Sequence, residues 1–122
     1  MDLPLENLRI LLVEDDPIIG LDLLETLEGA GAKVVGPAYN VPSALALLGS
    51  TPVDAAVLDN LIMHGDSGPV ADLLTQDGVA FLFHTSHRGT LRERYPAVPI
   101  IDKPSRPGEL VRAVKALVKL QR

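Results

Sequence analysis

Three carboxylates, a hydroxyl and an ammonium stand out in this sequence because each ends or directly follows a short apolar run. They are Glu14, Asp15, Asp59, Thr85 and Lys103. Carboxylates held close together repel one another, and their pKa values rise, unless a cation lies among them. A small set of oxygen ligands is typical of Mg²⁺, which keeps several waters and binds one or two carboxylates together with phosphate oxygens. An aspartate beside such an ion can attack a phosphoryl group, while the ion and a lysine offset the charge of that group. The residue types therefore indicate phosphoryl chemistry.

The elements that must position these residues follow from the apolar patterns. Short, nearly uninterrupted apolar runs are typical of strands buried on both faces, and they occur at 8–13, 33–38, 54–59, 79–85 and 98–102. Helical spacing predicts helices behind a cap at Asp16 as far as 29–31, and at 40–50, 68–76 and 108–122. The charged segment 88–96 fits either a short helix or an irregular loop.

Strands that alternate with helices predict a parallel α/β sheet covered on both faces, a doubly wound sheet of five βα units. In open sheets of this kind, ligand sites lie beyond the carboxyl ends of the strands. One edge of the predicted sheet therefore brings together Glu14, Asp15, Asp59, Thr85 and Lys103.

Length and composition restrict the function further. The 122 residues suit one domain over 1–122, and 47% apolar and 22% charged residues are ordinary for a globular protein. A net charge of −5 argues against nucleic-acid binding, and the lack of cysteine excludes thiol catalysis and cysteine-ligated zinc. No apolar run approaches the roughly 20 residues that span a membrane, and the N-terminus lacks a secretory signal, so we expect a cytoplasmic protein.

Four motifs, LLVEDDP, AAVLDN, FHTS and IIDKP, occur in this order, each at the end of a predicted strand. Together they resemble the receiver domain of two-component response regulators, the CheY-like family, over nearly the whole chain. The resemblance implies a flavodoxin-like (βα)5 fold with strand order 2-1-3-4-5. The short stretch between Thr85 and Lys103 predicts that the fourth helix is shortened or irregular. FHTSH and GPVADLL are also similar, more loosely, to single-domain regulators of alphaproteobacteria.

The resemblance implies a role for each candidate residue. Asp59 matches the phosphoacceptor, Thr85 the hydroxyl that bonds the phosphoryl group, and Lys103 the lysine that pairs with it. The implied Mg²⁺ ligands are Glu14 (through water), Asp15, Asp59 and the backbone carbonyl of Leu61. The peptide bond before Pro104 matches one that is typically cis.

The implied function is a phosphorylation-dependent signalling receiver with no output domain. A sensor histidine kinase or a phosphotransfer protein would supply the phosphoryl group, and the receiver would catalyse its own phosphorylation without being a conventional enzyme. The phosphorylated form would bind a downstream protein that the sequence does not identify, as a monomer or weak dimer. Leu61, two residues after Asp59, has no polar group to orient an attacking water, which predicts slow autodephosphorylation.

Two features depart from the family pattern and leave alternatives open. Ile100 occupies the place of the aromatic residue that usually changes rotamer on phosphorylation, and Ser105 the place of an aromatic that commonly follows Lys-Pro. These departures favour a non-phosphorylated interaction module, whereas the intact acid, Thr and Lys set argues against it.

A metal-dependent phosphatase with Asp59 as nucleophile generally needs a second acid where Leu61 lies. His64, His84 and His87 share no ligand spacing and are interpreted as packing residues.

Overall fold

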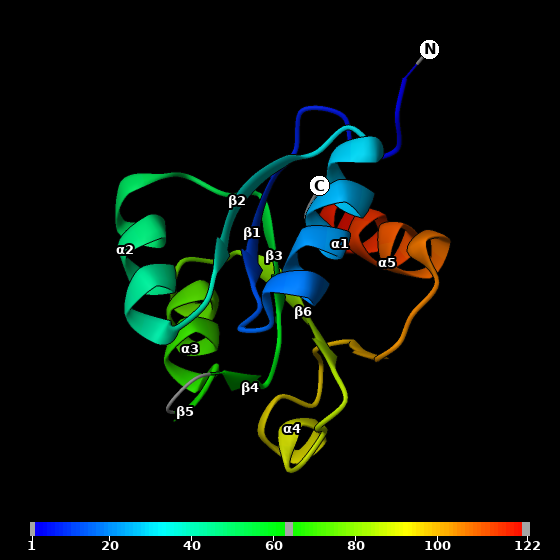
Figure 1. The fold of residues 1–122 in the computed structure, drawn as a ribbon. Helices are drawn as coiled ribbons and strands as arrows, with labels where there is room; N and C mark the ends of the chain where they lie inside the picture. The colour runs from blue at the N-terminus through cyan, green and yellow to red at the C-terminus, as the bar shows by residue number, and fades with distance from the viewer. Residues whose placement is uncertain (1, 63–64, 121–122) are drawn as a thin grey trace.

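The computed structural model describes residues 2–62 and 65–120 and shows a sheet between two layers of helices (Figure 1). Five strands pair in parallel in the order β2-β1-β3-β6-β7. Their bounds are Arg9–Val13 for β1, Lys33–Ala38 for β2, Ala55–Leu58 for β3, Ala80–Thr85 for β6 and Ile100–Asp102 for β7. Counted along this sheet alone, the order is 2-1-3-4-5, so the predicted topology is confirmed.

The helices divide between the two faces of the sheet. They are α1 (Pro17–Gly29), α2 (Val41–Ser50), α3 (Gly68–Gln76), α4 (Leu91–Arg94) and α5 (Pro107–Leu120). One face is covered by α1 and α5, and the other by α2 and α3 (Figure 1). Side chains of β1 alternate between these layers, Ile10 and Leu12 toward one and Leu11 and Val13 toward the other. Because both faces are buried, the strand reads as a continuous apolar run.

The starts of the first two helices are fixed by side-chain caps. The Asp16 carboxylate accepts hydrogen bonds from the backbone N–H groups of Ile18 and Ile19, at 2.9 and 3.2 Å. Pro17 follows in the first turn, where no N–H is needed. Asn40 caps α2 by accepting from the N–H of Ser43 at 2.8 Å. The predicted cap at Asp16 is thus confirmed.

Two parts of the fold differ from or sharpen the sequence prediction. A small antiparallel pair, β4 (Leu61–Ile62) and β5 (Gly65–Asp66), lies between β3 and α3 and was not predicted, since two-residue strands are too short to show a period. Within the ambiguous segment 88–96, only the four residues of α4 are helical.

The peptide bond between Lys103 and Pro104 is cis, as expected. Every helix in the described ranges is too short or too polar to cross a bilayer.

Candidate functional site

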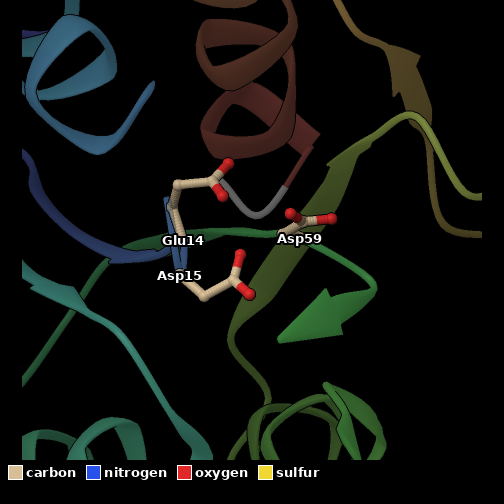
Figure 2. Close-up of side chains that lie close together, drawn as sticks. All are labelled: Glu14, Asp15 and Asp59. Carbon is tan, nitrogen blue, oxygen red and sulfur yellow. The ribbon is translucent and has the colours of Figure 1, made fainter. Parts of the chain in front are cut away.

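The acidic centre of the site lies where β1 and β3 end side by side. Val13 pairs with Leu58, so the next residues, Glu14 and Asp59, emerge at the same edge of the sheet. The N–H of Asp59 donates to the carbonyl of Val13 at 3.0 Å, which continues the ladder by one bond. One carboxylate oxygen from each of Glu14, Asp15 and Asp59 lies within 4.8 Å of the others, and Figure 2 shows the three groups converging. The structure therefore brings together the three acids predicted from the sequence.

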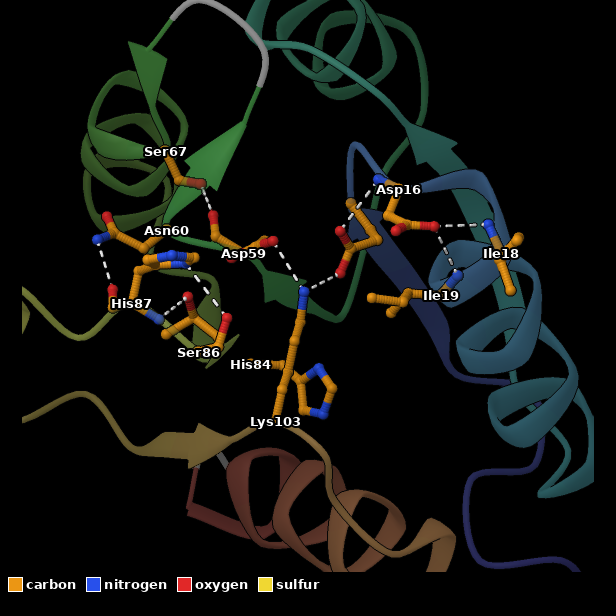
Figure 3. A network of polar contacts seen from close by, with 12 residues as sticks. Asp16, Ile18, Ile19, Asp59, Asn60, Ser67, His84, Ser86, His87 and Lys103 are labelled. Carbon is orange, nitrogen blue, oxygen red and sulfur yellow. Dashed lines mark hydrogen bonds and ion pairs between the residues drawn. The ribbon is translucent and has the colours of Figure 1, made fainter.

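Lys103 reaches into this acidic centre from the segment after β7. Its ammonium donates to Asp59 Oδ2 at 2.8 Å and also to Glu14 Oε1 (Figure 3). The side chains of Lys103 and Glu14 are 12% and 1% exposed, so both ion pairs are largely shielded from water. The three neighbouring acids need a cation among them, and this ammonium meets part of that need.

Burial and hydrogen bonding, respectively, raise the pKa values of Glu14 and Lys103. Burial raises the pKa of Glu14 to about 7, and the nearby charge of Asp59 adds to the rise, although the hydrogen bond from Lys103 opposes it. For Lys103, burial works against the charged form, but hydrogen bonds to Asp59 and Glu14 outweigh it and raise the pKa above its usual value. Lys103 is therefore charged at neutral pH, where Glu14 is only partly ionised.

The donor set fits a hard divalent cation. Within the described residues, Asp59 Oδ1 is buried and has no hydrogen-bond partner, so one oxygen of this carboxylate remains unsatisfied. Glu14, Asp15 and Asp59 offer oxygen ligands only, which suits Mg²⁺ better than a softer metal. Leu61 begins β4 two residues after Asp59, and the role of its carbonyl as a ligand remains a prediction.

Thr85 lies at the same edge of the sheet, where its side chain contacts the segment that follows β6. The residue ends β6 and is fully buried, and its hydroxyl oxygen accepts from the N–H of His87 at 3.0 Å. Across the described ranges, no hydrogen bond joins its hydroxyl to Asp59 or to Lys103. The backbone does join two of these residues, because the N–H of Lys103 donates to the carbonyl of Thr85 at 3.1 Å.

Two polar residues beside Asp59 were not predicted from the sequence. Ser67 is buried, and its hydroxyl donates to the carbonyl of Asp59, while its N–H donates to the carbonyl of Asn60 at 3.0 Å. The Asn60 side-chain amide donates to the carbonyl of His87 at 2.8 Å. Asn60 directly follows Asp59, which is a signal that the sequence offers, whereas Ser67 directly precedes α3 and has no such signal.

The histidines within the described residues are held by local contacts. His84 is 4% exposed, and its Nε2 lies 2.8 Å from the hydroxyl of Ser105. Burial, with the nearby charge of Lys103, lowers the pKa of His84, so the ring is neutral at pH 7. His87 Nδ1 lies 3.2 Å from the Ser86 hydroxyl. His64 lies outside the described residues.

Comparison with known proteins gives sequence relatives and structural neighbours. No protein-family model matches the sequence. The phyllosphere-induced regulator PhyR of Methylorubrum extorquens is 31% identical over 107 residues, 84% of this chain, and the chain spans only 40% of PhyR. SdrG from Sphingomonas melonis Fr1 is 32% identical, with 92% of this chain and 97% of SdrG covered and a TM-score of 0.80. The non-phosphorylated HemR receiver domain from Leptospira biflexa is 30% identical, with 95% and 98% covered and a TM-score of 0.82.

Proposed function

Because this chain belongs to the CheY-like receiver domains of response regulators, we propose that it accepts a phosphoryl group on Asp59, with Mg²⁺ as cofactor, and signals through a partner protein. The observation that supports this most directly is the arrangement around Asp59. One carboxylate oxygen binds the Lys103 ammonium at 2.8 Å, the other has no hydrogen-bond partner in the described chain, and two further acids lie beside it. That combination leaves a nucleophilic oxygen beside a cation that can offset incoming negative charge.

The proposed reaction transfers a phosphoryl group from a phosphohistidine of a sensor kinase or phosphotransfer protein. A carboxylate oxygen of Asp59 attacks phosphorus and a P–O bond forms as the P–N bond breaks. The departing ring nitrogen keeps the electron pair of that bond and takes a proton from water, so the donor leaves as neutral imidazole. Glu14, Asp15, Asp59 and the carbonyl of Leu61 would hold Mg²⁺, which when bound offsets charge on the phosphoryl oxygens. Lys103 is already charged and adjacent to Asp59, so it can pair with the transferred group.

The product would change the balance of charge at this edge of the sheet. An aspartyl phosphate adds roughly −1.5 to −2 charge and three acceptor oxygens, by analogy with other phosphorylated residues. Lys103 would then divide its bonds differently between Glu14 and the phosphoryl group. A donor hydroxyl at Thr85 would gain an acceptor, which biases the ends of β6 and β7 toward a second arrangement. That second arrangement is the one a downstream protein would bind.

Phosphorylation with a small donor tests the proposal. The chain is incubated with acetyl phosphate and Mg²⁺, and its intact mass is followed with time. We expect a gain of one phosphoryl group that is absent with EDTA and absent in Asp59→Asn. Asp77→Asn is the matched control, because Asp77 is an exposed acid after α3, remote from the acidic centre.

The same experiment distinguishes the proposed phosphorylated receiver from the alternative, a non-phosphorylated interaction module. The four-residue α4 favours that alternative, because the element that usually reports the switch is reduced to one turn. An unchanged mass at saturating donor, together with no Mg²⁺ binding by titration calorimetry, would select the interaction module.

A further inference from the structure

Two consecutive residues after β6, His87 and Arg88, are hydrogen-bonded to three of the four strand ends that carry the candidate site, those of β3, β6 and β7. The carbonyl of His87 accepts from the side chain of Asn60, the residue after Asp59, at 2.8 Å. The N–H of His87 donates to the hydroxyl of Thr85 at 3.0 Å. The guanidinium of Arg88 donates to both carboxylate oxygens of Asp102, the residue before Lys103, at 2.8 and 2.9 Å.

The contact of His87 with Asn60 is better shielded from water than the ion pair between Arg88 and Asp102. Asn60 is only 9% exposed, whereas the side chains of Arg88 and Asp102 are 41% and 61% exposed and form a surface pair of small energetic value. The backbone of Asn60 is fixed as well, because its carbonyl accepts from the N–H of Ser67. Gly89 lies close by, since a Cβ built there would be 3.7 Å from Asn60 Nδ2. The backbone of Asn60 is therefore held in place, and its side-chain amide is directed at the carbonyl of His87 (Figure 3).

The bond from His87 to Thr85 determines how the Thr85 hydroxyl can be used. A hydroxyl has one hydrogen to donate and two lone pairs. With its oxygen accepting from the N–H of His87, the remaining hydrogen of Thr85 is free to be donated to a phosphoryl oxygen. Loss of that N–H would let the hydroxyl rotate and lose this orientation.

We propose that Asn60 is a positioning residue for Thr85: it holds the His87 backbone so that the Thr85 hydroxyl is presented as a donor to a phosphoryl group on Asp59. The inference rests on the proposed function. It also connects the site to α4, because the N–H of Leu91 donates to the carbonyl of Arg88 at 2.9 Å. A movement of Thr85 would then reach Leu91, the first residue of α4, through the backbone of His87 and Arg88. This route needs no aromatic side chain at position 100.

A double-mutant cycle tests whether Asn60 acts through Thr85. Asn60→Leu removes the amide at similar volume, and Thr85→Val removes the hydroxyl. The rate of phosphorylation by acetyl phosphate with Mg²⁺ is measured for the unaltered chain, both single variants and the double variant. We expect Asn60→Leu to slow phosphorylation about tenfold in the unaltered background, and by less than about twofold in the Thr85→Val background.

The outcomes separate this inference from the proposed function. An Asn60→Leu effect that persists undiminished in the Thr85→Val background, or no effect at all, overturns the positioning role alone. Failure of the unaltered chain to take up a phosphoryl group overturns the proposed function and this inference with it.

A measurement on the unaltered chain covers the case in which a variant fails to fold. The side-chain amide hydrogens of Asn60 and the N–H of His87 are followed by NMR hydrogen exchange. The side-chain amide of the exposed Asn7 is the reference. We expect both groups to be protected relative to Asn7 and to change together on phosphorylation. Exchange of the Asn60 amide as fast as that of Asn7 contradicts the inference.

Discussion

Replacing Lys103 by Met should destabilise the metal-free protein strongly at about pH 8 and weakly at about pH 5.5. The ammonium of Lys103 contacts both Glu14 and Asp59, and its removal leaves two largely buried carboxylates without a counter-charge. Breaking a buried pair in this way costs about 3 to 5 kcal/mol. At the lower pH, Glu14 can take up a proton, because its pKa is already raised to about 7 and Lys103 lowers it at present. The destabilisation caused by Lys103→Met should therefore become smaller as the pH is lowered.

The assay is urea unfolding at both pH values in the presence of EDTA, followed by circular dichroism. Lysine remains charged in both buffers, since its raised pKa means that its contribution is lost only well above neutral pH. Lys115→Met is the matched control, because Lys115 is exposed on α5 and has no ion-pair partner within the described residues. Equal losses for Lys103→Met and Lys115→Met at about pH 8, or a loss for Lys103→Met that does not depend on pH, would refute the account of the acidic centre.

Three further perturbations follow from particular contacts. Glu14 has a pKa raised from 4.5 to about 7, so the folded state holds the proton more tightly, and stability falls as pH rises through this window, by on the order of 3 kcal/mol; Glu14→Gln should flatten that slope in urea titrations without metal. Gly36 has φ of +115°, and a Cβ there would lie 2.7 Å from the carbonyl oxygen of Leu12; Gly36→Ala should cost more than about 1 kcal/mol, whereas Gly49→Ala, in open space on α2, should not destabilise the fold. Leu61→Asn should shorten the half-life of the phosphorylated chain after removal of acetyl phosphate, because it introduces a group that can orient water; an unchanged half-life would exclude that role for position 61.

The sheet and most helix positions were predictable because their signals are local. Continuous apolar runs gave five strands, and a cap at Asp16 followed by Pro17 placed the start of α1. The three acids were predicted to meet because parallel strands end at one edge of a sheet, and the register of Val13 with Leu58 is what brings Glu14 beside Asp59. These inferences need only the period of the chain and the direction of its strands.

The contacts within the site were not predictable, since they join residues far apart in sequence. No pattern indicates that the hydroxyl of Ser67 turns back to the carbonyl of Asp59 or that Asn60 reaches His87. The Lys103 ammonium lies among the acids in the structure, whereas only a metal was expected to offset their charge. The bond from the N–H of His87 to the hydroxyl of Thr85 was not predictable either, and the role of Thr85 toward a phosphoryl group remains a prediction.

The central claim, that Asp59 is the residue that accepts the phosphoryl group, is tested most directly by mapping the modified residue. The chain is phosphorylated with acetyl phosphate and Mg²⁺, reduced with borohydride, digested and sequenced by mass spectrometry. An aspartyl phosphate is reduced to homoserine, whereas unmodified carboxylates and phosphorylated hydroxyls are not. We predict homoserine at position 59 and unreduced aspartate at every other aspartate position, including Asp15. Homoserine elsewhere with aspartate retained at position 59, or none at all after a gain in mass, would contradict the account.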